Sequence, residues 1–520
     1  MIYQVYPRSF FDANGDGVGD IPGIIAKLDY IAGLGCDAIW LSPVFLSPMK
    51  DFGYDVEDYR EIDQSFGTLA DFDQLVEAVH GRGLKLIIDQ VYSHSSNRHA
   101  WFEESRQDRT NPKADWYVWA DPKPDGTAPN NWLAAFGGIA WAWEPRRRQY
   151  YLHNFLPEQP DLNLTNPEVQ DAILDVARFW LERGVDGFRL DVANLYCHDP
   201  LLRDNPPSGK ADAHRPHEMQ LHLHDRSRPE NLEFLRRLRQ LLDSYPDRMA
   251  VAELFTDHPA ERTAEYTGAG DLLHTAYNFA LLGERFGSVY IRDTVQEHLE
   301  KGPNSWPSWA FSNHDRKRVV SRWSFNNEPK GRAKLLLALL TCLPGTPFLY
   351  QGEELGLTES DVPFERLRDP DGIAFWPENK GRDGCRTPIP WRSEAPFAGF
   401  STAEPWLPAD PLHKALAVDL QEKDPDSVLN FTKAWLAWRR EHPALIGGSI
   451  QFLTLPEPIL GFIRADENEA LLMLFNLGND ATIQPCPELR GGYSVFNLGG
   501  SVFGGSALLP RNGGLVACLS

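Results

Sequence analysis

Acidic, histidine and arginine side chains follow four short apolar runs in this 520-residue sequence. The set comprises Asp89 and His94 from LIIDQVYSH, Arg189 and Asp191 from GFRLD, Glu253 from VAEL, and His314 and Asp315 from FSNHD. If these runs are parallel strands of one barrel, their carboxyl ends meet at a single face and the side chains converge there. Any one of them could be a helix cap or a surface ion pair, but the whole set at successive strand ends favours an active site.

Clustered carboxylates without a metal-ligand spacing suit glycoside hydrolysis. One carboxylate attacks the anomeric carbon, and a second group with a raised pKa protonates the departing oxygen. Asp191 stands beside Arg189, whose charge we expect to keep it ionised, as a nucleophile requires. Glu253 follows Val251 and Ala252 in an apolar strand, which suits a general acid. A two-metal hydrolase is the alternative, although it usually needs more carboxylates within bonding reach.

The elements that must position these residues alternate between strands and helices. The strand candidates are Ile2–Tyr6, Ala38–Leu41, Leu84–Val91, Gly187–Asp191, Met249–Leu254, His274–Phe279, Trp309–Ser312 and Pro347–Gln351. Helical spacing marks Ile24–Ala32, Phe72–Val79, Pro167–Glu182, Leu232–Asp243, Arg332–Thr341 and Val428–Arg440. Eight strands interleaved with helices predict an α/β fold, a closed (β/α)₈ TIM barrel, in preference to an open doubly wound sheet.

Three stretches depart from this alternation. Residues 95–163 are rich in Trp, Pro, Asn and Gly and predict a subdomain inserted after the third strand. A second excursion covers about 355–410, and the tail 447–520 has the short strand-like runs and Gly-rich turns of a small all-β domain. The predicted catalytic barrel therefore comprises residues 1–94 and 164–446.

The charge balance excludes some partners. The sequence has 51 Lys and Arg against 73 Asp and Glu, a net charge of −22, which repels nucleic acid and anionic membrane surfaces. The longest strongly apolar run, Leu335–Leu343, is about half the length that a membrane span needs. The opening MIYQVYPRSF has no export signal. We therefore expect a cytoplasmic protein with no nucleic-acid partner and no membrane partner.

Several motifs occur together in a familiar order. They are YQVYPRSF, QPDLN at 159–163, GFRLDVAN, VAEL, FSNHD and KGRDGCRTPIPW at 380–391. With this set the sequence resembles the α-amylase superfamily of glycoside hydrolases over nearly the whole chain. The QPDLN form and the KGRD segment are more narrowly similar to its oligo-1,6-glucosidase and α-glucosidase branch.

The resemblance implies residue roles. Asp191 matches the family's nucleophile, Glu253 its acid/base, and Asp315 the carboxylate that grips the 2- and 3-hydroxyls of the sugar. The positions that bind the terminal glucose are matched by Tyr54, Asp55, His94, Arg189, His314 and Arg382. Asp55 and Arg382 would close the pocket so that only a chain end fits, which gives exo action. The implied partner is a short α-glucoside of the maltose or isomaltose type, with no organic cofactor.

The loop DANGDGVGD at 12–20 presents oxygens separated by glycines. Such alternation suits a hard divalent ion, although the flanking helices and terminal Glu of an EF-hand are missing, and a plain polar turn is the alternative. The resemblance favours a structural cation, Ca²⁺ or Mg²⁺. The predicted ligands are Asp12, Asn14, Asp16, Val18 and Asp20.

Five histidines lie between residues 194 and 229, namely His198, His214, His217, His222 and His224. Clustered histidines can indicate zinc. Because neither a cysteine pair nor a helical HxxxH accompanies them, we interpret this stretch as a variable loop that lines the aglycone side.

Other functions use the same barrel. If a sugar or alcohol acceptor resolves the covalent intermediate, the enzyme is a transglucosylase or a sucrose-type isomerase. Some relatives are non-catalytic transporter partners, but they carry a membrane helix and have lost catalytic carboxylates, and neither feature is found here.

The resemblance also bears on linkage preference. In the oligo-1,6-glucosidase and α-glucosidase branch, Val at position 192 accompanies tolerance of α-1,6 bonds, whereas Thr or Ala accompanies α-1,4 preference.

Overall fold

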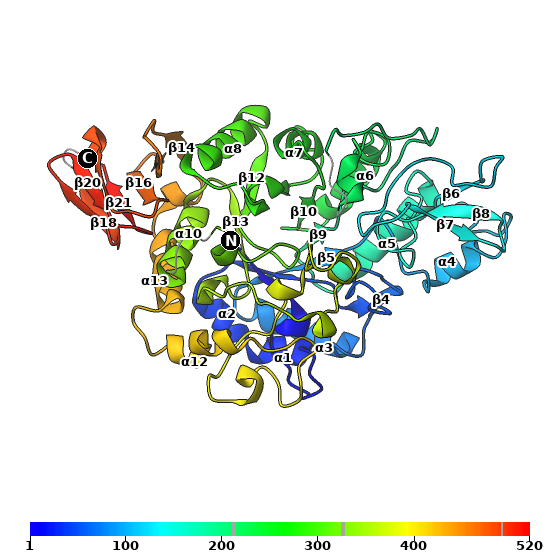
Figure 1. The fold of residues 1–520 in the computed structure, drawn as a ribbon, viewed down its shortest axis with the longest axis horizontal. Coiled ribbons are helices and arrows are strands. Elements are labelled where there is room, and N and C mark those ends of the chain that lie inside the picture. The colour runs from blue at the N-terminus through cyan, green and yellow to red at the C-terminus, as the bar shows by residue number, and fades with distance from the viewer. Residues whose placement is uncertain (211–214, 324–327, 490–491, 520) are drawn as a thin grey trace.

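A closed parallel barrel forms the centre of the molecule (Figure 1). The computed structural model describes residues 1–210, 215–323, 328–489 and 492–519. Within them the barrel strands are β1 (Ile2–Val5), β2 (Ala38–Leu41), β5 (Lys85–Gln90), β9 (Gly187–Leu190), β10 (Met249–Glu253), β11 (Thr275–Asn278), β12 (Trp306–Ala310) and β13 (Thr346–Tyr350). They neighbour one another in chain order, and β13 pairs with β1. The predicted (β/α)₈ barrel is confirmed.

The register of the strands brings charged residues together above an apolar interior. Asp89 on β5 is the pairing partner of Arg189 on β9, and Arg189 is in turn level with Val251 on β10. Below this layer, Trp40, Ile87, Tyr277 and Phe348 belong to one buried cluster inside the barrel. The sheet therefore delivers its polar side chains at the carboxyl ends of the strands, over a packed floor.

Helices surround the barrel. The longer ones are α1 (Ile21–Ala26), α2 (Leu28–Leu34), α3 (Leu69–His80), α5 (Pro167–Glu182), α6 (Asn231–Asp243), α7 (Pro259–Thr267), α8 (Ser288–Lys301), α10 (Pro329–Cys342) and α13 (Val428–Arg440). Their starts follow local rules: Thr68 and Asp71 form a capping box on α3, and Asn166 caps α5 ahead of a proline. The apolar run at Leu335–Leu343 is the buried helix α10 and the residue after it, packed against α13.

The largest differences from the sequence prediction concern four helices and the start of one strand. The single helix predicted over Ile24–Ala32 is two helices, α1 and α2, which are separated at Lys27. Helices α7 and α8 were not predicted, because their buried positions are partly polar: Thr294 and His298 lie on the buried face of α8. Strand β12 starts at Trp306, three residues before the predicted start, and ends at Ala310, because Pro307 is accommodated within it. FSNHD therefore forms the loop after β12.

Smaller sheets lie at either side of the barrel in the view of Figure 1. Between β5 and α5 the chain forms α4 (Ala100–Ser105) and a sheet of β6 (Trp119–Ala120), β8 (Gln149–Leu152) and β7 (Trp141–Glu144). β3 (Phe45–Leu46) pairs with β4 (Asp58–Ile62). The C-terminal sheets are β14 (Ser449–Phe452), β15 (Ile459–Ala465), β16 (Ala470–Asn476), β21 (Gly514–Cys518) and β18 (Tyr493–Leu498), and β17 (Thr482–Pro485), β20 (Ser506–Leu509) and β19 (Ser501–Phe503).

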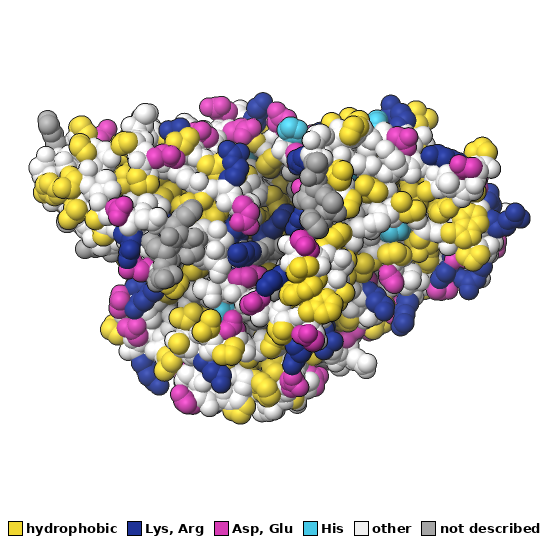
Figure 2. All heavy atoms as spheres, viewed as in Figure 1, with side chains coloured by type: hydrophobic (Ala, Val, Ile, Leu, Met, Phe, Trp, Pro, Cys, Tyr) yellow, Lys and Arg dark blue, Asp and Glu magenta, His cyan; other side chains and the backbone are white. Residues whose placement is uncertain are grey.

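The surface in Figure 2 shows basic side chains interspersed with acidic ones. Among the described residues, none of the helices has the length and apolar character that crossing a bilayer requires.

Candidate active site

A single guanidinium joins three of the carboxylates that the sequence singled out. Nη1 of the fully buried Arg189 lies 2.8 Å from Oδ1 of Asp89 and 2.7 Å from Oδ1 of Asp191. Its Nη2 lies 2.5 Å from Oε2 of Glu253. Asp191 directly follows β9 and Glu253 ends β10, so two neighbouring strands deliver both carboxylates to the same face. Arg189 is thus the support behind the pair and does not itself line the pocket.

Three carboxylates around one cation leave an excess of negative charge. Burial raises the pKa of Asp191 well above its usual value, and the charges of Glu253 and Asp89 add to this rise, whereas Arg189 opposes it. Burial likewise raises the pKa of Asp89 to about 6. The expectation that Arg189 simply keeps Asp191 ionised is therefore wrong. The buried site therefore favours the protonated form of Asp191, which must lose its proton before it can act as a nucleophile.

Asp315 approaches from the loop after β12. Its Oδ1 lies 2.7 Å from Nη2 of Arg386 and 3.3 Å from Nη1 of Arg382. Burial alone would raise the pKa of Asp315, but the guanidinium charges of Arg382 and Arg386 help to lower it well below its usual range. Asp315 is therefore an ionised, partly exposed acceptor, which suits a group that receives hydrogen bonds from sugar hydroxyls.

Arg382 also pairs with a second acid, Asp51, on the side of the pocket where Asp315 lies. Its Nη2 donates to Oδ1 of Asp51 at 2.8 Å and to Oδ1 of Asp369 at 2.6 Å. Asp51 and Arg382 both line the pocket, whereas the buried Asp369 anchors the guanidinium from behind. The sequence analysis did not name Asp51, although it stands four residues before the Asp of FGYD.

The predicted sugar contact of Asp55 is wrong. This side chain is fully buried and does not line the pocket. Its carboxylate accepts hydrogen bonds from Oγ of Ser47 (2.9 Å) and from the backbone amides of Lys50 (2.8 Å) and Asp51 (3.0 Å). Asp55 therefore shapes the loop that presents Asp51.

Of the other predicted glucose-binding residues, Tyr54 and His94 line the pocket and His314 lies behind it. The hydroxyl of Tyr54 donates to Asp89 (3.0 Å) and lies 2.6 Å from Nε2 of His314, on whose ring Tyr54 stacks. Burial lowers the pKa of His94 to about 4 and that of His314 to about 3. Both rings are therefore neutral near pH 7 and contribute hydrogen bonds.

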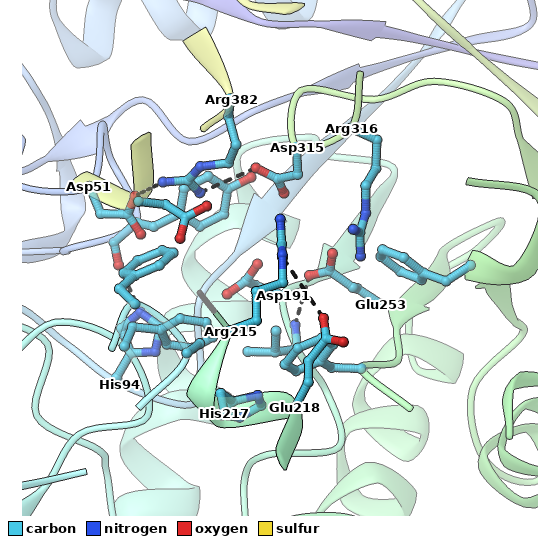
Figure 3. Close-up of a pocket in the computed structure, with 18 of the residues that line it drawn as sticks. Asp51, His94, Asp191, Arg215, His217, Glu218, Glu253, Asp315, Arg316 and Arg382 are labelled. Carbon is cyan, nitrogen blue, oxygen red and sulfur yellow. Dashed lines mark hydrogen bonds and ion pairs between the residues drawn. The ribbon is translucent and has the colours of Figure 1, made fainter. Parts of the chain in front are cut away.

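The pocket holds ≈ 1060 Å³ of empty space, its open mouth included, which is ample for a disaccharide. Asp51, Asp315 and Arg382 lie along one side, His217 and Glu218 along the other, and Asp191 and Glu253 between them (Figure 3). Sequence reasoning missed its aromatic and charged lining, namely Phe136, Phe155, Phe255, Phe279, Phe375, Arg215, Glu218, Arg316 and Asp371. Phe255, two residues after Glu253, Phe279, at the end of a predicted strand, and Arg316, directly after FSNHD, carried a usable signal. The others come from stretches without periodicity.

The histidine-rich stretch divides in the structure. His217 lines the pocket, in keeping with an aglycone-side loop. His222 pairs with Asp225, His224 lies 3.7 Å from Asp199, and His198 packs against a tryptophan. His214 lies outside the described residues.

The loop at 12–20 curls around its own acidic side chains. Asp12 accepts hydrogen bonds from the amides of Gly15 (2.6 Å) and Gly17 (2.7 Å), both at positive φ, and Asp20 accepts one from Gly23 and caps α1. The other predicted ligands, Asn14, Asp16 and Val18, lie in the same turn. This all-oxygen donor set fits a hard cation in its chemistry. Within the described part of the chain, however, no three His, Cys, Asp or Glu side chains gather as a metal site.

A (β/α)₈ barrel with paired carboxylates at the carboxyl ends of its strands defines a class of barrel hydrolases. Residues 4–448 match the alpha amylase catalytic domain, so the chain belongs to the α-amylase family of glycoside hydrolases. It is 52% identical over 500 residues to a probable alpha-glucosidase of Rhizobium meliloti (strain 1021), covering 94% of this chain and 91% of that protein. It is 37% identical over 526 residues to an oligo-1,6-glucosidase of Parageobacillus thermoglucosidasius, with the same shares covered.

Among solved structures, the alpha-glucosyl transfer enzyme XgtA superposes with a TM-score of 0.96 at 53% identity, over 100% of this chain and 98% of that one. A trehalose-6-phosphate hydrolase of Bacillus licheniformis has a TM-score of 0.91 at 31% identity, over 100% and 98%. The predicted family, fold and enzyme class are confirmed.

Proposed function

We propose that this protein is an exo-acting, retaining α-glucosidase. It releases α-glucose from the non-reducing end of short α-glucosides of the maltose or isomaltose type. The observation that carries the proposal is the order of groups along the pocket: the ion pair of Asp51 with Arg382 on one side, Asp191 and Glu253 in the middle, and His217 with its stacked partner Phe255 on the other side.

The chemistry follows from this order. Asp191 attacks the anomeric carbon while Glu253 gives its proton to the glycosidic oxygen, so the leaving group departs and a covalent glucosyl-enzyme remains. Glu253 then takes a proton from water, whose oxygen attacks the anomeric carbon and frees Asp191. Arg189 contacts both carboxylates and compensates the charge that moves between them. Asp315 accepts hydrogen bonds from the ring hydroxyls as the sugar distorts.

Exo action is supported by the ion pair of Arg382 with Asp51. This pair offers donors and acceptors for the hydroxyls of a terminal glucose. Phe255, stacked on His217 at the wall opposite Arg382, suits a variable aglycone.

The test is proton NMR of the first glucose formed from maltose, with isomaltose, sucrose and trehalose assayed beside it. Retention requires α-glucose to appear first, before mutarotation. The β-anomer as the first product, or cleavage within long chains without glucose release, would contradict the proposal.

A second candidate, transglucosylation through the same intermediate, is favoured by the resemblance to XgtA, a transfer enzyme by its printed name. Comparing glucose release with transfer product at high donor concentration measures the balance. If transfer product exceeds glucose at every donor concentration, transglucosylation is the main activity of this protein.

We also propose that the loop at 12–20 binds a structural divalent cation. Its acidic and amide oxygens within one glycine-curled turn support this, and its position outside the pocket lining gives it no part in the reaction.

A further inference from the structure

The wall of the pocket opposite Arg382 includes two stacked rings. His217 and Phe255 both line the pocket, and their ring planes are 8° from parallel with centroids 5.6 Å apart. Phe255 follows the proposed acid Glu253 by two residues, and both line the same pocket. The orientation of Phe255 therefore shapes the space that a leaving group or an acceptor occupies.

His217 is held by the buried contact between His222 and Asp225. Its ring stacks on His222 with centroids 3.9 Å apart, and Nε2 of His222 lies 2.8 Å from the backbone oxygen of His217. Nδ1 of His222 lies 2.6 Å from Oδ2 of Asp225, which is 2% exposed. Both nitrogens of His222 thus face oxygen acceptors, which fixes the ring at both edges.

Arg226, the residue after Asp225, also contacts Phe255, in addition to the stacking of His217 on that ring. The guanidinium carbon of Arg226 lies 4.7 Å from the ring centroid of Phe255, a cation–π distance. Arg226 is 8% exposed, so its side chain is surrounded by protein atoms and has little contact with solvent. Two consecutive residues, Asp225 and Arg226, therefore support Phe255, one through the histidines and one directly.

We propose that His217, His222, Asp225 and Arg226, here called the 217–226 support, position Phe255 and thereby determine discrimination among aglycones. The residues of this support that lie behind the wall, His222, Asp225 and Arg226, are positioning residues. The inference rests on the proposed α-glucosidase activity, because it concerns the leaving-group side of that site.

The test compares two substrates that share glucose and differ in the leaving group, maltose and 4-nitrophenyl α-glucoside. Phe255→Ala and Asp225→Ala should each change the ratio of the two kcat/KM values in the same direction, on the order of fivefold or more. The double variant should change it no further than Phe255→Ala alone, because Asp225 acts through Phe255. Asp225→Asn keeps an acceptor for His222 and should restore most of the ratio.

Asp199→Ala is the matched control. Asp199 lies in the same stretch, residues 194–229. It is buried and forms an ion pair with Arg203, but it does not line the pocket. Its variant should keep the wild-type ratio. If Asp225→Ala does not fold, His222→Gln and Arg226→Lys replace it, since each disturbs a different contact of the support.

Fluorine NMR of 4-fluorophenylalanine incorporated at position 255 tests positioning without turnover. One line is expected in the otherwise unchanged protein, and a shifted or broadened line with Asp225→Ala but not with Asp199→Ala. An unchanged ratio and line in folded Asp225→Ala, an equal loss for both substrates, or additivity with Phe255→Ala would overturn the inference. Lack of wild-type activity on either substrate would contradict the proposed function, and the NMR line would still decide the positioning.

Discussion

The backbone amide of Val192 donates a hydrogen bond of 3.1 Å to Oε2 of Glu253, which ties the residue after Asp191 to the proposed acid. Val192 has a φ of 34°, in a region that β-branched residues rarely adopt. The next amide, of Ala193, donates to the backbone oxygen of Glu253 at 2.8 Å. These two bonds hold the ends of β9 and β10 together, so the relative position of Asp191 and Glu253 is set largely by the backbone.

Removing either carboxylate separates the two chemical steps. Asp191→Asn should reduce turnover by about a thousandfold or more, because no nucleophile remains. Glu253→Gln should accumulate glucosyl-enzyme from a substrate whose leaving group needs no proton, since water then lacks its base. Mass spectrometry of the intact protein detects the adduct. Ordinary activity in either variant would mean that the roles are misassigned.

Replacing Asp89 should shift the pH profile. The charge of Asp89 raises the pKa of Asp191, so Asp89→Asn leaves Arg189 less neutralised and should lower the pKa of Asp191. The nucleophile then stays ionised to lower pH, and the acidic limb of kcat/KM against pH should move to lower pH. Asp186→Asn is the control, because Asp186 pairs with His80 and Lys85 just before β9, away from the pocket. An acidic limb that stays in place would count against the effect of Asp89 on Asp191.

Variants of Asp51 should lose catalytic efficiency, whereas variants of Asp55 should lose thermal stability. Asp51→Ala removes a partner of Arg382, and kcat/KM for maltose should fall roughly tenfold to a hundredfold, from ~1–3 kcal/mol for a buried group left unpaired. Asp55→Asn places an NH₂ group toward the amide of Lys50, so it should lower the melting temperature. Kinetics and melting curves on both variants check this. A specific KM effect in stable Asp55→Asn would restore Asp55 as a sugar contact.

The positions of Asp51, which lines the pocket, and Asp55, which does not, show what could and could not be predicted from the sequence. Periodicity located the barrel strands, and the residues at the ends of β5, β9 and β10 converge because parallel register requires it. A short loop is different: whether Asp51 or Asp55 faces the pocket depends on which one satisfies the amides of the turn, and no period encodes that. The raised pKa of Asp191 was also not predictable, since it depends on burial and on the charges of Arg189, Glu253 and Asp89, whose distances only the fold sets.

Chelation should destabilise the protein without stopping catalysis. An ion that binds only the folded state at about a hundred times its dissociation constant adds about 2.7 kcal/mol, so a chelator should lower the melting temperature. Turnover at low temperature should persist in enzyme that stays folded. Asp16→Ala should abolish the chelator effect, whereas Asp125→Ala, which loses a similar turn bond to the amide two residues on, should keep it. Melting curves insensitive to chelator would exclude the site.

Linkage preference should depend on Val192. Its side chain lines the pocket beside Glu253, where an apolar branch and a hydroxyl favour different aglycone orientations. We expect cleavage of isomaltose beside maltose, and Val192→Thr should raise the maltose-to-isomaltose ratio of kcat/KM by an amount equivalent to ~1–3 kcal/mol or less. Val192→Ile, β-branched and apolar, is the matched control and should leave the ratio nearly unchanged. Wild-type enzyme inert on isomaltose, or an unchanged ratio in Val192→Thr, would remove Val192 as the determinant and direct attention to residues 194–229, which include the 217–226 support.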